Sequence, residues 1–462
     1  GGVATSLYNF LHSTKDILDC DLLVFNEESI DEDKVPSSVK ILQPQTLLHI
    51  LGKFHNEIKE ESSWMTLFRI VLFVFARYIN GEFSRCLLFP FIRCLGNYDF
   101  AISYAQDDSW KSLSKGCNDY VIKKVKAKYK VAMVHCDYAN FGGYDKRQTA
   151  LFEKFDTIIC VSESCCKSFV SCFPNLKEKV IACENFINVD EIRHLSEDSI
   201  EYSHDNINFV SVCRLSYVKG LSRTINVFKR LFDEGIINFR WTIVGDGLEY
   251  DNLVKQSRSC GLSEQILFVG NQLPPYPYIK NASYFLLPSL HEAAPMVFGE
   301  CAVLGVPIIS TRTCSAVELV EDRSLGIVTE NCAEGIYSVL KNILTGIPFY
   351  YIKPDIDTIN SNAYRQFNHL INLTLSKKGG SAQLSLLFCI TRCPSVSGKS
   401  GGAVQLLDHF LGGALGIIVR GLRGLITLVA VNGNDSLALL GVADVDERLG
   451  ESGFKIIVHD GG

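Results

Sequence analysis

Short apolar runs alternate with longer amphipathic segments along most of the chain. In the first half these runs lie at 19–26, 39–43, 98–105, 129–138, 155–164 and 179–190. Runs of this length, separated by helix-length segments, predict parallel strands joined by helices. Before them, residues 1–13 predict a glycine turn and a helix that carries Leu7, Phe10 and Leu11 on one face.

The same alternation restarts at residue 207. The second series of apolar runs lies at 207–215, 239–247, 266–271, 285–290, 306–311 and 325–329. Residues 221–235 predict an amphipathic helix that ends at a glycine. Two such series predict an α/β fold with two domains, in which ligands bind at the carboxyl ends of the strands.

These patterns divide the chain into four parts: 1–187, 188–345, a helical segment at 346–375, and a tail at 376–462. Neither Tyr nor Trp occurs after Tyr364, although the chain has 18 Tyr. The tail is interpreted either as a small appended module or as sequence outside the fold. Its Ser397–Ser400 stretch lacks the glycine that a phosphate loop needs, since Cys393 stands there.

Composition narrows the class of protein. The chain has 462 residues, of which 47% are hydrophobic and 21% charged, so it is long enough for two or three cores. Its net charge of −6 argues against a dedicated nucleic-acid-binding protein. The 17 cysteines are scattered without a CxxC pair, which is typical of reduced thiols in the cytoplasm.

Residues 64–95 are apolar and aromatic, and their charges are almost all arginines: Arg69, Arg77, Arg85 and Arg93. No apolar run there reaches the roughly 18–20 residues that span a bilayer. One interpretation is a helix that lies in a membrane interface. The favoured alternative is a buried helix pair with arginines at its rim.

The stretch from His291 to Ser310 holds two glutamates, Glu292 and Glu300, between two apolar runs. Pro295 fits the first position of a helix, and Gly305 fits its end. Both carboxylates then flank a helix N-terminus at the carboxyl end of a strand, where α/β sheets bind phosphorylated ligands. Glutamates at this spacing also occur often by chance.

Several motifs occur in a fixed order in the second domain: CRLSYVKG with Arg214 and Lys219, VGDG, FVGNQ, and the glutamate pair. The ordered set resembles the family 4 retaining glycosyltransferases of the GT-B fold, of the bacterial surface-polysaccharide type, over residues 1–370. Gly1-Gly2 and VHCDY fit that family too. The resemblance implies two Rossmann-like domains facing each other across a cleft, 1–187 for the acceptor and 188–345 for the donor. It also implies a first strand ahead of Gly1-Gly2, which this chain is predicted to lack.

The resemblance also implies roles for individual residues. Arg214 and Lys219 would bind the donor diphosphate, Glu292 the sugar and Glu300 the ribose. His135 would lie near the transferred sugar, or serve only as a structural histidine, and Asp137 is a weaker candidate. The other implied donor-binding residues are Gly2, Gly245, Gly247, Asn271, Ala294, Pro295, Met296 and Val297.

From this resemblance we expect a retaining hexosyltransferase that uses a nucleotide-sugar donor, a UDP-sugar by preference, and a glycan or lipid-linked acceptor. No cofactor and no obligatory metal ion are expected, and the location would be cytoplasmic, at the inner face of the membrane. Ala293-Ala294 replaces the Gly-Phe of many members, which leaves the sugar open. The alternatives are a GT-B nucleotide-sugar epimerase and a nucleotide-sugar-binding protein without turnover. A dinucleotide dehydrogenase is disfavoured, because no G-x-G-x-x-G follows a strand.

Overall fold

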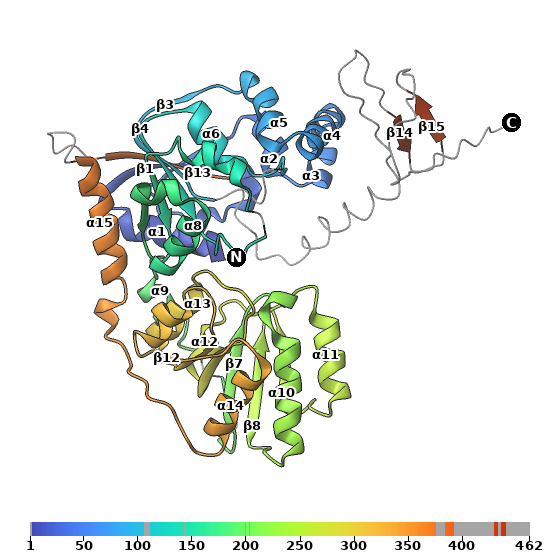
Figure 1. The fold of residues 1–462 in the computed structure, drawn as a ribbon, viewed down its shortest axis with the longest axis vertical. Coiled ribbons are helices and arrows are strands. Elements are labelled where there is room, and N and C mark those ends of the chain that lie inside the picture. Colours follow the sequence, from blue (N-terminus) through green and yellow to red (C-terminus); the bar gives the residue numbers. More distant parts are fainter. Residues whose placement is uncertain are drawn as a thin grey trace. The chain divides into compact units, whose positions relative to one another are not determined.

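The computed structural model describes residues 2–105, 111–142, 144–198, 200–202, 204–375, 384–391, 429–432 and 436–439. The chain forms two compact units, Gly1–Val396 and Ser397–Gly462. The described part of the second unit is one antiparallel pair of strands, β14 (Val429–Asn432) and β15 (Ser436–Leu439). The first unit contains two separate parallel sheets (Figure 1).

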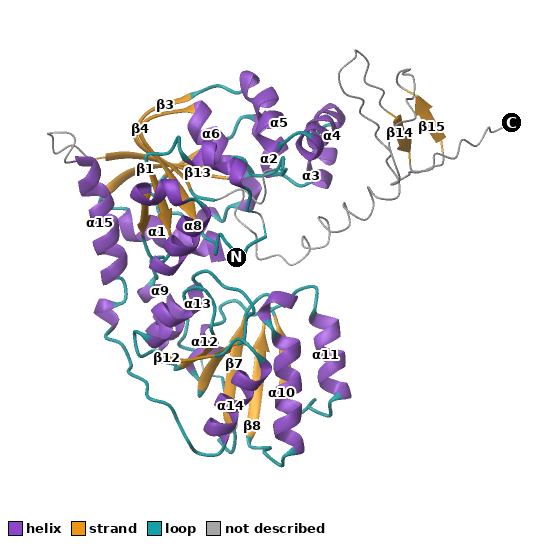
Figure 2. Ribbon diagram, in the orientation of Figure 1, coloured by secondary structure: helices purple, strands orange, loops and turns teal. Residues whose placement is uncertain are grey.

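The sheet of the N-terminal lobe has the order β2-β1-β13-β3-β4-β5-β6, and all neighbouring strands are parallel. Figure 2 distinguishes strands from helices in this lobe by colour. Its strands are β1 (Leu18–Val24), β2 (Lys40–Leu42), β3 (Leu95–Ser103), β4 (Val125–Val134), β5 (Thr157–Cys160), β6 (Val180–Ala182) and β13 (Leu384–Ile390). The helices of this lobe are α1 (Gly2–Thr14), α2 (His49–Gly52), α3 (His55–Glu61), α4 (Ser63–Tyr78), α5 (Gly81–Leu88), α6 (Cys117–Lys124), α7 (Thr149–Phe152), α8 (Glu163–Cys172) and α15 (Ser361–Leu375).

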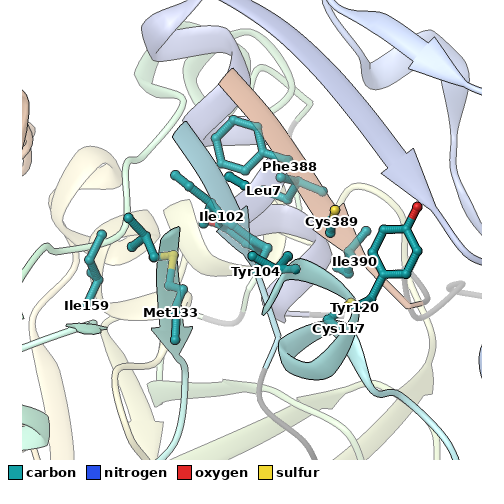
Figure 3. Close-up of a cluster of buried hydrophobic side chains, with 14 of the residues drawn as sticks. Leu7, Ile102, Tyr104, Cys117, Tyr120, Met133, Ile159, Phe388, Cys389 and Ile390 are labelled. Carbon is teal, nitrogen blue, oxygen red and sulfur yellow. The ribbon is translucent and has the colours of Figure 1, made fainter. Parts of the chain in front are cut away.

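An interior strand of this sheet, β13, which lies between β1 and β3, comes from the tail of the chain. It pairs with β1 from Leu18↔Leu384 to Val24↔Ile390, and with β3 from Leu386↔Phe100 to Cys389↔Ser103. Figure 3 shows its side chains beside those of β3 in the buried core. The assignment of all of 376–462 to a tail apart from the two lobes is therefore wrong for 384–390. The strand predicted ahead of Gly1-Gly2 stays a prediction.

The sheet of the C-terminal lobe has the order β12-β11-β10-β7-β8-β9, again all parallel. Its strands are β7 (Ile207–Val212), β8 (Phe239–Val244), β9 (Ile266–Gly270), β10 (Tyr284–Leu287), β11 (Ile308–Thr311) and β12 (Gly326–Thr329). Its helices are α10 (Leu221–Asp233), α11 (Tyr250–Ser259), α12 (Tyr276–Lys280), α13 (Met296–Leu304) and α14 (Ala333–Leu344). The order of the strands reverses between β7 and β10, which makes this point the topological switch point.

The predicted helix pair at 64–95 is present as α4 and α5, but its arginines do not all lie at a rim. Arg85 is buried and pairs with the buried Asp119, with 2.6 Å between Nη2 and Oδ2. Arg69 points inward and donates to the carbonyl oxygen of Lys53 at 2.8 Å. Arg77 and Arg93 alone of the four are exposed. No helix in the described part of the chain is long and apolar enough to cross a bilayer.

The chain passes between the lobes twice, near α9 (Val189–His194) on the way out and before α15 on the return. Asn360 joins the two crossings. Its Oδ1 accepts from the amide of Ile187 at 2.9 Å, and its Nδ2 donates to the carbonyl oxygen of Ile187 at 2.9 Å. After this crossing Ala363, Phe367 and Leu370 of α15 pack in the core of the N-terminal lobe.

Candidate functional site

Two predicted site residues meet at the switch point of the C-terminal sheet. Lys219 ends the 3-10 turn that follows β7, and Glu292 lies in the loop after β10. Lys219 Nζ donates to Glu292 Oε1 at 2.5 Å, and Ser289 Oγ donates to the same oxygen at 2.7 Å. The structure thus brings together two residues that are 73 positions apart in the sequence.

The backbone at this point is fixed by a close approach of two loops. Gly220 has φ +66°, and a Cβ there would lie 2.1 Å from the carbonyl oxygen of Pro288, so glycine is required. The amide of Leu290 donates to the carbonyl oxygen of Val218 at 2.7 Å. The loop that carries Glu292 is therefore held against the loop that carries Lys219.

Arg223 also contacts the loop that carries Glu292, and it was not among the predicted site residues. Its guanidinium donates to the carbonyl oxygen of Pro288 at 2.8 Å and to Asn331 Oδ1 at 2.5 Å. Burial lowers the pKa of Arg223. An arginine in the first turn of an amphipathic helix is usually a solvated surface residue, so only the fold reveals the contacts of Arg223.

Helix α13 starts directly after the Glu292 loop. Pro295 is its N-cap residue, with φ −62° and ψ 125°, and the helix begins at Met296, so the prediction of Pro295 as first helical residue is wrong by one position. Gly305 ends the helix in the left-handed conformation, as predicted. Ala294 and Met296 are half-buried and Val297 is buried. The free amides and dipole at the start of α13 favour an anion there.

Glu300 lies one turn into α13 in a desolvated position. Burial raises the pKa of its carboxyl group to about 7, with a smaller contribution from the charge of Glu191. No hydrogen bond from another described residue reaches its oxygens. A desolvated carboxylate without a partner favours hydroxyl groups that can donate to it.

The remaining predicted donor residues lie at the carboxyl ends of β7, β8 and β9. Arg214 is exposed, and among the described residues no carboxylate forms a salt bridge with it. Gly245 has φ +140°, and a Cβ there would lie 1.9 Å from the carbonyl oxygen of Cys213, so its glycine is required by packing. Gly247 lies at the same edge, and Asn271 is exposed just after β9.

His135 directly follows β4 in the N-terminal lobe. Burial lowers its pKa to about 4, so the imidazole is neutral at physiological pH. Its ring lies 4.8 Å from the ring of Tyr104, which follows β3. The Tyr104 hydroxyl shares a hydrogen bond of 2.8 Å with Ser6, and Ser6 donates to Asn185 at 2.6 Å. These three polar residues were not predicted.

The contacts of two weaker candidates, Asp137 and Gly2, are with other parts of the protein. Asp137 accepts hydrogen bonds from Ser168 and from Asn140, so its carboxylate is occupied by its own lobe. Gly2 is exposed at the start of α1, a helix that contacts α13. Neither observation assigns a role toward a ligand.

Direct contacts join the two lobes around α13. Ala293 and Ala294 pack against the core of the N-terminal lobe. Arg323 donates to Glu184 at 2.7 Å. A cavity of about 290 Å³ lies next to this contact and is lined by residues of α13 and of the returning chain, but Lys219, Glu292 and Glu300 are not among its lining residues. In the described part of the chain no three His, Cys, Asp or Glu side chains are placed to hold a metal ion.

The sequence of the C-terminal lobe is similar to a known protein family. Residues 195–345 match the family described as "Glycosyl transferases group 1". These residues form a group 1 glycosyltransferase domain. The domain contains Lys219, Glu292 and Glu300, so the residues gathered at the switch point all lie within the matched segment.

Two proteins of similar sequence show how far the similarity extends along the chain. The chain is 30% identical over 166 residues to an uncharacterized glycosyltransferase of Methanocaldococcus jannaschii, which covers 35% of this chain and 41% of that protein. It is 25% identical over 207 residues to the lipopolysaccharide core biosynthesis glycosyltransferase LpsE of Rhizobium meliloti, covering 45% of this chain and 58% of LpsE. The chain therefore spans only 41% to 58% of the length of these relatives.

The likeness in fold extends beyond the glycosyltransferase domain. The Anabaena protein HepE, solved with UDP and glucose, superposes with a TM-score of 0.52 over 82% of this chain and 96% of HepE, at 15% sequence identity. Both lobes thus share the fold of a GT-B glycosyltransferase, which confirms the predicted fold class. The retaining mechanism and the roles of single residues stay predictions.

Proposed function

We propose that the protein is a retaining hexosyltransferase that moves a sugar from a nucleotide-diphosphate donor to a glycan or lipid-linked acceptor in cell-surface polysaccharide synthesis. The observation that carries this proposal is the cluster at the switch point. A lysine, a glutamate and a helix N-terminus lie there at the carboxyl ends of adjacent strands, with the exposed cation Arg214 on the same edge.

The cluster suits the departure of a diphosphate. As the bond between the sugar and the phosphate breaks, negative charge builds on the leaving oxygen. Lys219, Arg214 and the amides at the start of α13 would stabilise that charge. Lys219 is already bound to Glu292, so the donor phosphate must share or displace this contact. Glu292 would then be free to accept from sugar hydroxyls.

Glu300 and His135 are proposed to bind the donor. Glu300 would accept from the two ribose hydroxyls, since its carboxylate has no partner among the described residues. The neutral imidazole of His135 would contact the transferred sugar from the N-terminal lobe. For retention, the acceptor hydroxyl attacks on the side of the leaving group, and the departing phosphate oxygen takes its proton. In this proposal no divalent ion is obligatory.

The donor and the acceptor are proposed from the relatives. HepE is similar in fold and was solved with UDP and glucose, which supports a UDP-hexose donor. LpsE is named for lipopolysaccharide core biosynthesis, which supports a glycan or lipid-linked acceptor. Such an acceptor places the enzyme at the cytoplasmic face of a membrane.

A membrane contact through α4 and α5 fits this acceptor. The pair exposes large apolar side chains, among them Trp64 at 60% and Leu67 at 56%, and Phe91 just beyond α5 is 69% exposed. Arg77 and Arg93 are the exposed arginines near them. Apolar side chains flanked by cations favour an anionic lipid surface.

A donor screen with the full chain tests the proposal. Thermal shift with a panel of nucleotide sugars should reveal one that raises the melting temperature, because a ligand that binds only the folded state stabilises it. Transfer from that donor to a lipid-linked acceptor is then followed by mass spectrometry. We expect Lys219→Ala to lower kcat by on the order of 100-fold. Lys229→Ala, which removes an exposed lysine of α10, serves as the matched control.

Three outcomes would contradict the proposal. Conversion of the donor to a different sugar or to free nucleotide, without any acceptor product, would indicate an epimerase. Tight donor binding without turnover would indicate a binding protein. Equal loss of activity in the Lys219 and Lys229 variants would show that the switch-point cluster has no special role.

A further inference from the structure

Two cysteines from different lobes face each other beside the lobe contact. Cys165 lies in the first turn of α8 in the N-terminal lobe, and Cys314 follows β11 in the C-terminal lobe. Their sulfur atoms are 3.9 Å apart, and both thiols are free. Next to them, the hydroxyls of Ser162 and Ser315 share a hydrogen bond of 2.6 Å. A disulfide bond requires these two sulfurs to approach to about 2.05 Å.

The surroundings of the pair favour a thiolate on Cys165. The hydrogen bond from Cys314 lowers the pKa of Cys165, and hydrogen bonds to Ser162 and Ser315 lower it further, while burial and the charge of Asp137 raise it. The pKa of Cys314 is raised, first of all by its hydrogen bond with Cys165.

A carboxylate from the opposite lobe lies close to the start of α8. Glu318 accepts from the amides of Glu163 and Ser164, at 3.0 and 2.8 Å. This contact and the serine pair hold the two cysteine-bearing segments in register. These hydrogen bonds fix the position of Cys165 relative to Cys314.

The two thiols differ in exposure, which sets the order of a reaction with an oxidant. Cys165 is buried, whereas Cys314 is partly exposed. A small disulfide such as oxidised glutathione can therefore reach Cys314 first. Buried Cys165 lies behind it in the position of a resolving thiol.

We propose that Cys165 and Cys314 form a reversible disulfide that ties the two lobes together under oxidising conditions. Cys314 gives up its proton and attacks one sulfur of oxidised glutathione, which releases one glutathione thiolate. The Cys165 thiolate then attacks the Cys314 sulfur of the mixed disulfide and releases the second. The two protein thiols lose two protons and two electrons, and two molecules of reduced glutathione leave.

The consequence is a covalent limit on the separation of the lobes. The disulfide joins an element of the N-terminal lobe to the loop after β11, next to the strand β10 that leads to Glu292. Formation of the disulfide does not depend on the proposed function. Only its effect on turnover does, since a donor that must enter between the lobes would exchange more slowly.

Peptide mapping of the full chain tests the proposal. After incubation with oxidised glutathione, mass spectrometry under non-reducing conditions should find a peptide pair joined through Cys165 and Cys314, which dithiothreitol separates. Cys165→Ser and Cys314→Ser should each abolish the linked pair. Cys166→Ser should keep it, because Cys166 contacts Cys160 within its own lobe and not Cys314.

The outcomes are decisive in either direction. A glutathione adduct that persists on wild-type Cys314, a link between Cys160 and Cys166 instead, or full alkylation of both thiols after oxidation would each overturn the proposal. If the enzyme turns over, oxidation should lower kcat reversibly in the wild type but not in Cys314→Ser. Because cross-linking is measured separately from turnover, failure of the proposed function leaves the mapping result readable.

Discussion

Burial of the Glu300 carboxyl group reduces the stability of the folded protein at high pH. Its carboxyl group is desolvated and lacks a partner among the described residues, so its pKa is raised to about 7 from 4.5. The folded state then holds this proton more tightly than the unfolded state does. Stability from this group is therefore lost as the pH rises from about 4.5 through about 7.

We predict that Glu300→Gln melts at a higher temperature than the wild type at pH 8 and that the difference shrinks at pH 5. A glutamine does not ionise, so it escapes the cost of desolvating a charge, on the order of 1 kcal/mol or more. The same variant should lose the stabilisation that a nucleotide sugar gives the wild type. Thermal melts at the two pH values, with and without donor, measure both effects.

Glu264→Gln is the control for this experiment, because it removes the same formal charge from an exposed position. It should leave both the melting temperature and the donor response close to those of the wild type. A wild type and a Glu300→Gln variant that melt together at pH 8 would show that Glu300 is not desolvated.

Among single residues, the sequence predicted those whose place follows from the ends of strands and missed those that depend on contacts between distant segments. Lys219 and Glu292 each follow a strand, and strand ends meet at one edge of a parallel sheet, so their proximity was predictable. The contacts of Arg223 were not predictable, because its partners Pro288 and Asn331 lie 65 and 108 positions away in the sequence. Arg223 donates to a backbone carbonyl oxygen of Pro288 and to the side-chain amide oxygen of Asn331. A local pattern does not encode such contacts.

Among the elements, α4 and α5 have both a buried face and an exposed apolar face. One face is buried through Met65, Leu72 and Ala76, as a helix pair of the core requires. The other face leaves large apolar side chains exposed. Hydrophobic periodicity does not separate these two faces in a segment that is apolar on nearly all sides.

We predict that Trp64→Ser combined with Phe91→Ser lowers the fraction of protein that floats with anionic liposomes by at least about threefold, since burial of each aromatic side chain contributes roughly 1.5–3 kcal/mol. Both side chains are exposed, so the fold should tolerate the changes. Tyr350→Ser is a matched control, because Tyr350 is an exposed aromatic of the C-terminal lobe. Flotation of the double variant at the wild-type level would remove the membrane contact from the proposal.

Strand β13 is the element that the sequence placed least well. Its run LSLLFCI has the composition of a buried strand, but its neighbours β1 and β3 precede it by more than 280 residues. Strand pairing at such separation has no local signature.

We predict that Leu387→Asp disrupts the N-terminal lobe. Leu387 is fully buried in the centre of the sheet, so an aspartate there would cost more than about 3 kcal/mol. Hydrogen exchange should show lost protection in β1 and β3, while β7, β8 and β10 of the other lobe keep theirs.

Leu273→Asp, at a position that is 67% exposed, should leave exchange unchanged throughout the described chain. Wild-type protection of β1 and β3 in Leu387→Asp would mean that this strand does not belong to the sheet.

In the first unit, the two lobes are not formed by two consecutive segments of the chain. The N-terminal lobe contains both the beginning of the described chain and residues 361–375 and 384–390, and the C-terminal lobe is inserted between them. The series of apolar runs predicted both sheets and nearly every strand in them. It did not predict that the chain returns to the N-terminal lobe, because the sequence of α15 fits a helix of either lobe.

The membership of β13 has a consequence for biosynthesis. A ribosome synthesises a chain from its N-terminal side, so β1 and β3 emerge hundreds of codons before β13, the strand that lies between them. The C-terminal lobe, whose strands all lie between 207 and 329, has every partner it needs while the earlier lobe still waits. The later lobe should therefore mature first, and the nascent chain should depend on chaperones that cover unpaired strand edges until residue 390 leaves the exit tunnel.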